Sequence, residues 1–109
     1  MKVRINYLTY EIKEEESLLT DKNIVLNGDC DHENLVIHLQ KNLVPERKRQ
    51  VLLHELLHAI TDNLELHLDE EEIEMTSIGL MMFLVDNIPF IKKVIAEVEK
   101  EGIDNKVKK

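Results

Sequence analysis

The stretch VLLHELLHAITD, Val51–Asp62, places two histidines four residues apart in an otherwise apolar run, with a glutamate directly after the first. Residues four apart lie one turn above each other on the same face of a helix. His54 and His58 can therefore direct their imidazoles at one metal ion while Glu55 projects beside it. Zinc accepts such nitrogens, and a carboxylate can hold a zinc-bound water ready for deprotonation. The pattern predicts a metal site on a helix.

The boundaries of this helix are marked in the sequence. Pro45 suits a first helical turn, where its missing N–H costs nothing, and the helix should run to about Asn63. On a helical wheel both histidines lie opposite a broad apolar arc. That arc consists of Leu52, Leu53, Leu56, Leu57 and Ile60. The alternative interpretation, two exposed histidines on the polar face of an amphipathic helix, predicts no third ligand nearby.

A third ligand is expected on the next helix, since catalytic zinc normally takes three protein ligands and one water. Asp69 is a good N-cap for that helix, which should end near Asn87 because Pro89 follows. On a helical wheel Glu74 points into the centre of the apolar face, where a carboxylate is costly unless it is paired or bound to metal. Glu74 is therefore the predicted third ligand, and Glu71 is the second choice. Dipole complementation in a first turn accounts for Glu70 to Glu72 without any metal.

The rest of the chain predicts a small sheet and one more helix. Apolar residues alternate from Val3 to Ile12 with an irregularity near Leu8, which suits a strand containing a slip or bulge. Two β-branched runs, Ile24 to Leu26 and Leu35 to Leu39, flank a polar segment with Asn27-Gly28 and predict a hairpin. A last helix should start at Pro89 and stop at Gly102. The predicted fold is α+β, with about three strands followed by three helices.

Length and composition limit the possible functions. The 109 residues fit one domain, here residues 1–102, followed by a flexible tail over 103–109. A formal net charge of −8 argues against direct binding of nucleic acid. Cys30 is the only cysteine, so no intrachain disulfide can form, and a reducing, cytoplasmic location is expected. No signal peptide or membrane-spanning apolar run is visible. The segment Cys30–Glu33 is explained more simply as a polar turn than as a metal cluster.

On these residues the chain resembles a gluzincin-type zinc metallopeptidase, in which HExxH is followed by a glutamate ligand in an E-x-x-[A/S] setting, here EMTS at 74–77. More narrowly it is similar to small phage and prophage proteins of the ImmA/IrrE-like metallopeptidase family. The similarity is most specific in PERKRQVLLHELLHAI, residues 45–60. It implies a minimal zincin-like fold, one zinc bound by His54, His58 and Glu74, and Glu55 as general base. It also implies a regulatory protein, such as a repressor, as substrate.

Two rival functions remain open from the sequence. One is a zincin-like interaction module that binds zinc without peptidase activity, and the other is a metal-free α+β interaction protein. The partners expected for the enzyme are a protein or peptide substrate, with no direct nucleic-acid binding and no membrane. The sequence does not reveal the oligomeric state or the group that stabilises the oxyanion. Candidates for that group by chemistry alone are His67, His38, Tyr7 and Tyr10.

Overall fold

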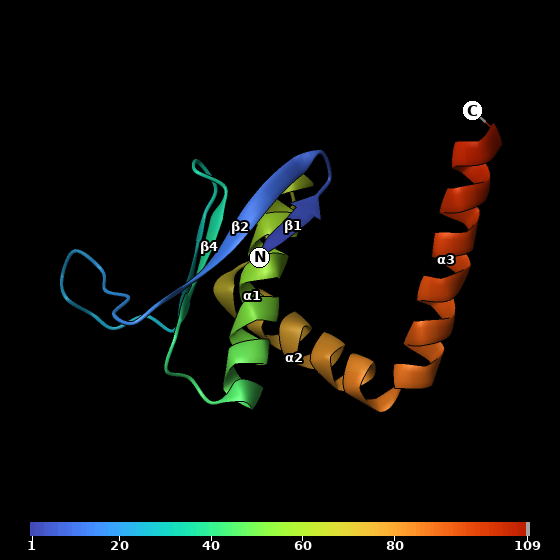
Figure 1. Ribbon diagram of the computed structural model, residues 1–109. Coiled ribbons are helices and arrows are strands. Elements are labelled where there is room, and N and C mark those ends of the chain that lie inside the picture. The colour runs from blue at the N-terminus through green and yellow to red at the C-terminus, as the bar shows by residue number, and fades with distance from the viewer. Residues whose placement is uncertain (109) are drawn as a thin grey trace. The chain divides into compact units, whose positions relative to one another are not determined.

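The computed structural model describes residues 1–108, with side chains as far as Gly102, and consists of two parts that meet between Ile78 and Gly79. The first part holds four strands, one whole helix and the start of a second helix, which confirms the predicted α+β class (Figure 1). The elements are β1 (Lys2–Ile5), β2 (Leu8–Glu15), β3 (Gly28–Asp31), β4 (Val36–Gln40), α1 (Pro45–Asn63), α2 (Glu70–Asp86) and α3 (Ile88–Lys108).

The four strands form one mixed sheet in the order β1-β2-β4-β3. β1 pairs with β2 and β3 pairs with β4 in antiparallel fashion, whereas β2 and β4 run parallel. β3 therefore lies at one edge of the sheet, where its outer backbone groups have no neighbouring strand among the described residues. This edge matters for function because it borders the candidate site.

The prediction of one irregular strand over the first residues is wrong, since the chain reverses there. Asn6 adopts a left-handed conformation with φ of 58°, which asparagine tolerates better than most residues, and the turn at Asn6 and Tyr7 separates β1 from β2. In the resulting register Ile5 lies opposite Leu8. The reversal adds the fourth strand.

The predicted hairpin is present, but its strands and its turn are displaced. Gly28 begins β3 instead of forming the turn, and the reversal lies between Asp31 and Val36. The Asp31 carboxylate accepts hydrogen bonds from the backbone N–H groups of Glu33 and Asn34 at 3.1 and 3.0 Å. This aspartate-based turn outweighs the Asn-Gly signal. The run Ile24–Leu26 forms only an isolated bridge, between Leu19 and Val25.

The core lies between one face of the sheet and α1, the helix drawn behind β1 and β2 in Figure 1. Tyr10 and Ile37 of the sheet are buried against Val51 and Ala59 of the helix. The hydroxyl of Tyr10 also accepts a hydrogen bond from the side-chain amide of Asn63 at 3.3 Å. α1 is thereby held along most of its length.

α1 has the predicted bounds, but the predicted apolar arc is only partly right. Ile60 is 38% exposed, whereas His54 and Glu55 are each only 8% exposed. The helical wheel assumes that only one side of α1 is covered. In the structure two sides are covered, one by the sheet and one by the first turns of α2. His54 and Glu55 are therefore buried polar groups rather than members of a solvated face.

α2 begins with the predicted cap. Asp69 accepts a hydrogen bond from the backbone N–H of Glu72 at 2.8 Å, and the Glu72 carboxylate accepts one from the backbone N–H of Asp69 at 2.9 Å. This reciprocal pair is a capping box, which fixes where the first turn starts. α3 starts beside Pro89 as expected.

The predicted end of α3 at Gly102 is wrong, because the helix continues to Lys108. A glycine inside a helix costs only about 1 kcal/mol, too little to end it. The division into a domain over 1–102 and a flexible tail stays a prediction. No helix within residues 1–108 has the length and apolar character needed to cross a membrane.

Candidate metal centre

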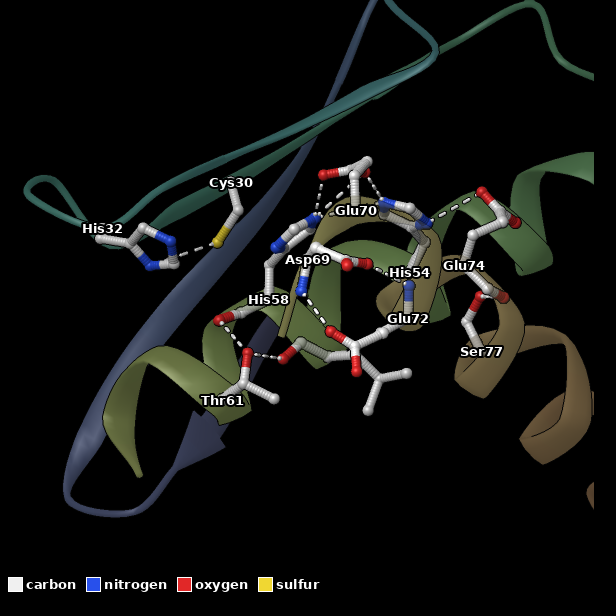
Figure 2. A network of polar contacts seen from close by, with 11 residues as sticks. Cys30, His32, His54, His58, Thr61, Asp69, Glu70, Glu72, Glu74 and Ser77 are labelled. Atoms are coloured by element: carbon white, nitrogen blue, oxygen red, sulfur yellow. Dashed lines mark hydrogen bonds and ion pairs between the residues drawn. The ribbon is translucent and has the colours of Figure 1, made fainter. Parts of the chain in front are cut away.

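Three side-chain donors from α1 and α2 converge on one point. The Nε2 atoms of His54 and His58 are 3.2 Å apart. Glu70 places Oε1 2.5 Å from the first of these nitrogens and Oε2 3.1 Å from the second (Figure 2). Donor atoms on a tetrahedral zinc, each bound at 2.0–2.1 Å, lie about 3.3 Å from one another. The 3.2 and 3.1 Å separations are close to this value, whereas the 2.5 Å contact is that of a direct hydrogen bond between His54 and Glu70. One donor atom from each of the three residues lies within 4.8 Å of the others, so the set is compatible with a single metal ion.

A second carboxylate contacts the other nitrogen of His54. Oε2 of Glu74 lies 3.1 Å from Nδ1, so His54 is flanked by Glu70 and Glu74, as Figure 2 shows. A proton on Nδ1 can be donated to Glu74, and the lone pair of Nε2 then points toward His58 and Glu70. A carboxylate in this position commonly orients a metal-binding histidine and fixes its tautomer.

The structure thus brings His54 and His58 together, places Glu74 against His54, and adds Glu70. Glu74 reaches His54 but not the meeting point of the two Nε2 atoms, and Glu71 is exposed and contacts neither histidine. The helical wheel was centred on apolar residues farther along α2, whereas its first two turns bury Ile73 and Ser77. That face also carries residues 70 and 74, because 70, 73, 74 and 77 follow helical spacing. This spacing was the available signal for Glu70.

Ser77 joins the two helices from a fully buried position. It accepts a hydrogen bond from the side-chain amide of Gln50 at 2.8 Å and donates one to the carbonyl oxygen of Glu74 at 2.8 Å. Gln50 lies one turn before His54 on α1. The bond from Gln50 fixes how α2 is rotated about its axis and hence where its carboxylates point.

Glu55 is held against the edge strand. A Cβ atom at Gly28 would lie 2.6 Å from Cγ1 of Val51 and 3.1 Å from Oε2 of Glu55, so only glycine fits beside the carboxylate without a shift. Burial raises the pKa of Glu55 to about 7, while His54 lowers it and Glu70 raises it further. A carboxylate that titrates near neutral pH can both accept and return a proton.

Two cavities border Glu55 and Gly28. One has a volume of about 150 Å³ and lies toward the start of α1, lined also by Arg47, Gln50 and Glu74. The other has a volume of about 270 Å³ and lies farther along α1, at His58. The oxyanion candidates His67, His38, Tyr7 and Tyr10 line neither cavity. Both cavities therefore give access to Glu55, but neither supplies one of those four groups.

Cys30 faces the second cavity from β3, rather than lying in a turn. Its Sγ is 3.7 Å from Nδ1 of His32, which is 3.4 Å from the Asp62 carboxylate. Burial raises the pKa of the Cys30 thiol to about 12, and the nearby Glu55 and Asp29 carboxylates raise it further. The thiol is accordingly protonated and unreactive at neutral pH.

A helical HExxH beside a carboxylate from the next helix, all supported by a small sheet, defines the metallopeptidase class. The sequence agrees with this geometry, because residues 3–100 match the IrrE N-terminal-like domain, the M78 family of peptidases. The chain belongs to this family, as its resemblance to ImmA/IrrE-like metallopeptidases predicted. No curated protein and no solved structure shows a significant match.

The close approach of Gly28 to α1 can be tested by adding one methyl group. We expect Gly28→Ala to lower the free energy of unfolding by about 1–3 kcal/mol, because the new Cβ overlaps Val51. The double variant Gly28→Ala/Val51→Ala should lose less free energy of unfolding than the sum of the losses in the two single variants. Gly79→Ala is the control, since its added Cβ meets no other part of the protein within 4 Å and, inside α2, should raise the free energy of unfolding by up to about 1 kcal/mol. Urea denaturation compares the wild type with all four variants, and an unchanged midpoint for Gly28→Ala would contradict the packing.

The burial of Cys30 predicts slow thiol labelling. In chelator-treated protein at pH 8, iodoacetamide should react about 10³-fold more slowly than with the same chain in guanidinium, because a higher pKa leaves less thiolate. Mass spectrometry follows the modified fraction with time. Equal rates in the folded and unfolded chains would show that the thiol is open to solvent.

Proposed function

We propose that this protein is a zinc-dependent metallopeptidase that binds one zinc ion through His54, His58 and a carboxylate of α2. The observation that carries the proposal is the convergence of the two Nε2 atoms and the Glu70 carboxylate beside the buried Glu55. Between the two carboxylates, the geometry favours Glu70 as ligand. Glu74, the ligand expected from sequence, fits better as the partner that orients His54.

The reaction proposed for this site is hydrolysis of a peptide bond. Zinc, when bound, would polarise the scissile carbonyl and lower the pKa of a water molecule. Glu55 takes the proton of the attacking water and passes it to the leaving amine. Its position supports both steps, since the side chain borders both cavities.

The edge strand supports a peptide or protein as substrate. Among the described residues β3 pairs with β4 on one side only, so its outer N–H and C=O groups can pair with an extended chain. Gly28, at the start of β3, lies directly beside Glu55. A chain added to this edge would therefore pass close to the general base. The resemblance to ImmA-type proteins favours a regulatory protein, such as a repressor, as the natural substrate.

Metal analysis of purified protein tests the site. We expect about one zinc per chain in the wild type, little in His54→Ala or His58→Ala, and unchanged zinc in Glu55→Gln. Glu70→Gln should lose more zinc than Glu74→Gln, because loss of an orienting partner weakens affinity only about 10–100-fold. Glu71→Gln is the matched control, an exposed neighbour with the same chemical change. A wild type that stays zinc-free after reconstitution would contradict the proposal.

Cleavage separates the enzyme from its main rival. Zinc-loaded wild type should cut peptides, and Glu55→Gln should be slower by about 10²–10⁴-fold, the range for loss of a general base. Full zinc without cleavage of any peptide would instead establish the zinc-binding interaction module.

A further inference from the structure

We propose that Arg47 binds a carboxylate of the substrate close to the scissile bond, so that the enzyme selects peptides carrying an acidic group there. This inference rests on the proposed peptidase function. The observation behind it is that the 150 Å³ cavity bordering Glu55 and Glu74 contains one permanently charged basic side chain, Arg47.

Arg47 occupies the same face of α1 as the metal-binding histidines. It is followed at helical spacing by Gln50, Val51 and His54, and all four line this cavity. Arg47 is therefore placed to meet a chain that lies along α1 toward Glu55.

The guanidinium of Arg47 is available for a ligand. Arg47 is exposed, and no carboxylate in the described part of the chain forms an ion pair with it. Glu74, on the same cavity, contacts His54 instead. Lys48, by contrast, is already paired with Glu14. A free guanidinium in a cavity favours a carboxylate, which it can bind through two parallel hydrogen bonds.

The spacing along α1 sets where the acidic group lies on the substrate. Arg47 and His54 are seven positions apart on the helix, which corresponds to a rise of about 10 Å at 1.5 Å per residue. An extended peptide covers this distance in about three residues. The carboxylate should therefore lie within three residues of the scissile bond, on one side of it. Aspartate, glutamate and a free C-terminus share this chemistry.

Cleavage of random peptide mixtures tests the inference. Zinc-loaded wild type is incubated with heptapeptides capped at both ends, and with the same mixture carrying a free C-terminal carboxylate, and mass spectrometry identifies the cut sites. We expect Asp and Glu to be enriched about 10-fold at one position within three residues of the cut. Preferential cleavage of the uncapped mixture alone would identify the C-terminus as the bound carboxylate.

The variants assign the preference to one side chain. Arg47→Glu should lose the acidic preference and favour Lys or Arg at the same position, with zinc content unchanged, while Arg47→Lys should keep part of it. Arg49→Glu is the matched control, since it makes the same charge change on α1 but borders a different cavity with Pro45 and Leu52. Its preference should equal that of the wild type.

The failures of the two proposals are distinguishable. If the wild type binds zinc but cuts no peptide in either mixture, the peptidase function is wrong and the inference is lost with it. If the wild type cuts peptides without preference for Asp, Glu or a free C-terminus, or if Arg47→Glu keeps that preference, the function stands and the role of Arg47 is overturned.

Discussion

The contact between α1 and the first two turns of α2 is the constraint on which the site depends. The capping box at Asp69 sets where α2 begins, and the hydrogen bond from Gln50 to Ser77 sets how it is rotated. Together they bring Glu70 and Glu74 to the two ring nitrogens of His54. A different start or rotation of α2 would leave the histidines without a carboxylate, and α1 alone offers only two donors.

The same contact concentrates negative charge in a partly buried place. Glu55, Glu70 and Glu74 all act on one small region, and the raised pKa values of Glu55 and Cys30 have burial as their main cause and neighbouring carboxylates as a further one. The ionised form of the buried Glu55 is unfavourable in such surroundings unless a cation compensates it. A divalent ion at the two histidines would supply that compensation, which links the stability of the arrangement to its proposed function.

Local signals in the sequence were sufficient for the starts of the helices but not for the end of α3 or for the sheet. Pro45 and Asp69 act on their own helix starts, so both predictions were confirmed. The strands depend on which of several competing turns forms. The chain turns at Asn6 instead of continuing as one strand past Leu8, and it turns after Asp31 instead of at Asn27-Gly28. The predicted class was right, while the strand boundaries and the number of strands were not.

The grouping of the site residues follows from the sequence where one helix carries them, and not where two helices must meet. His54, Glu55 and His58 lie four residues apart or less, so their grouping follows from helical geometry. The choice among the acids of α2 depends on which face of that helix meets α1, and a helical wheel drawn on the whole of α2 could not show that. Burial of Ile73 and Ser77 shows which face of α2 meets α1, and Glu70 lies on that face.

Zinc K-edge X-ray absorption on the reconstituted protein tests the central claim most directly, because it reports the atoms bound to the metal. The account predicts four nitrogen or oxygen neighbours at about 2.0–2.1 Å, with the outer-shell scattering of two imidazoles. A sulfur neighbour at about 2.3 Å would place Cys30 on the metal and contradict the proposed ligand set. Scattering from fewer than two imidazoles would contradict it equally.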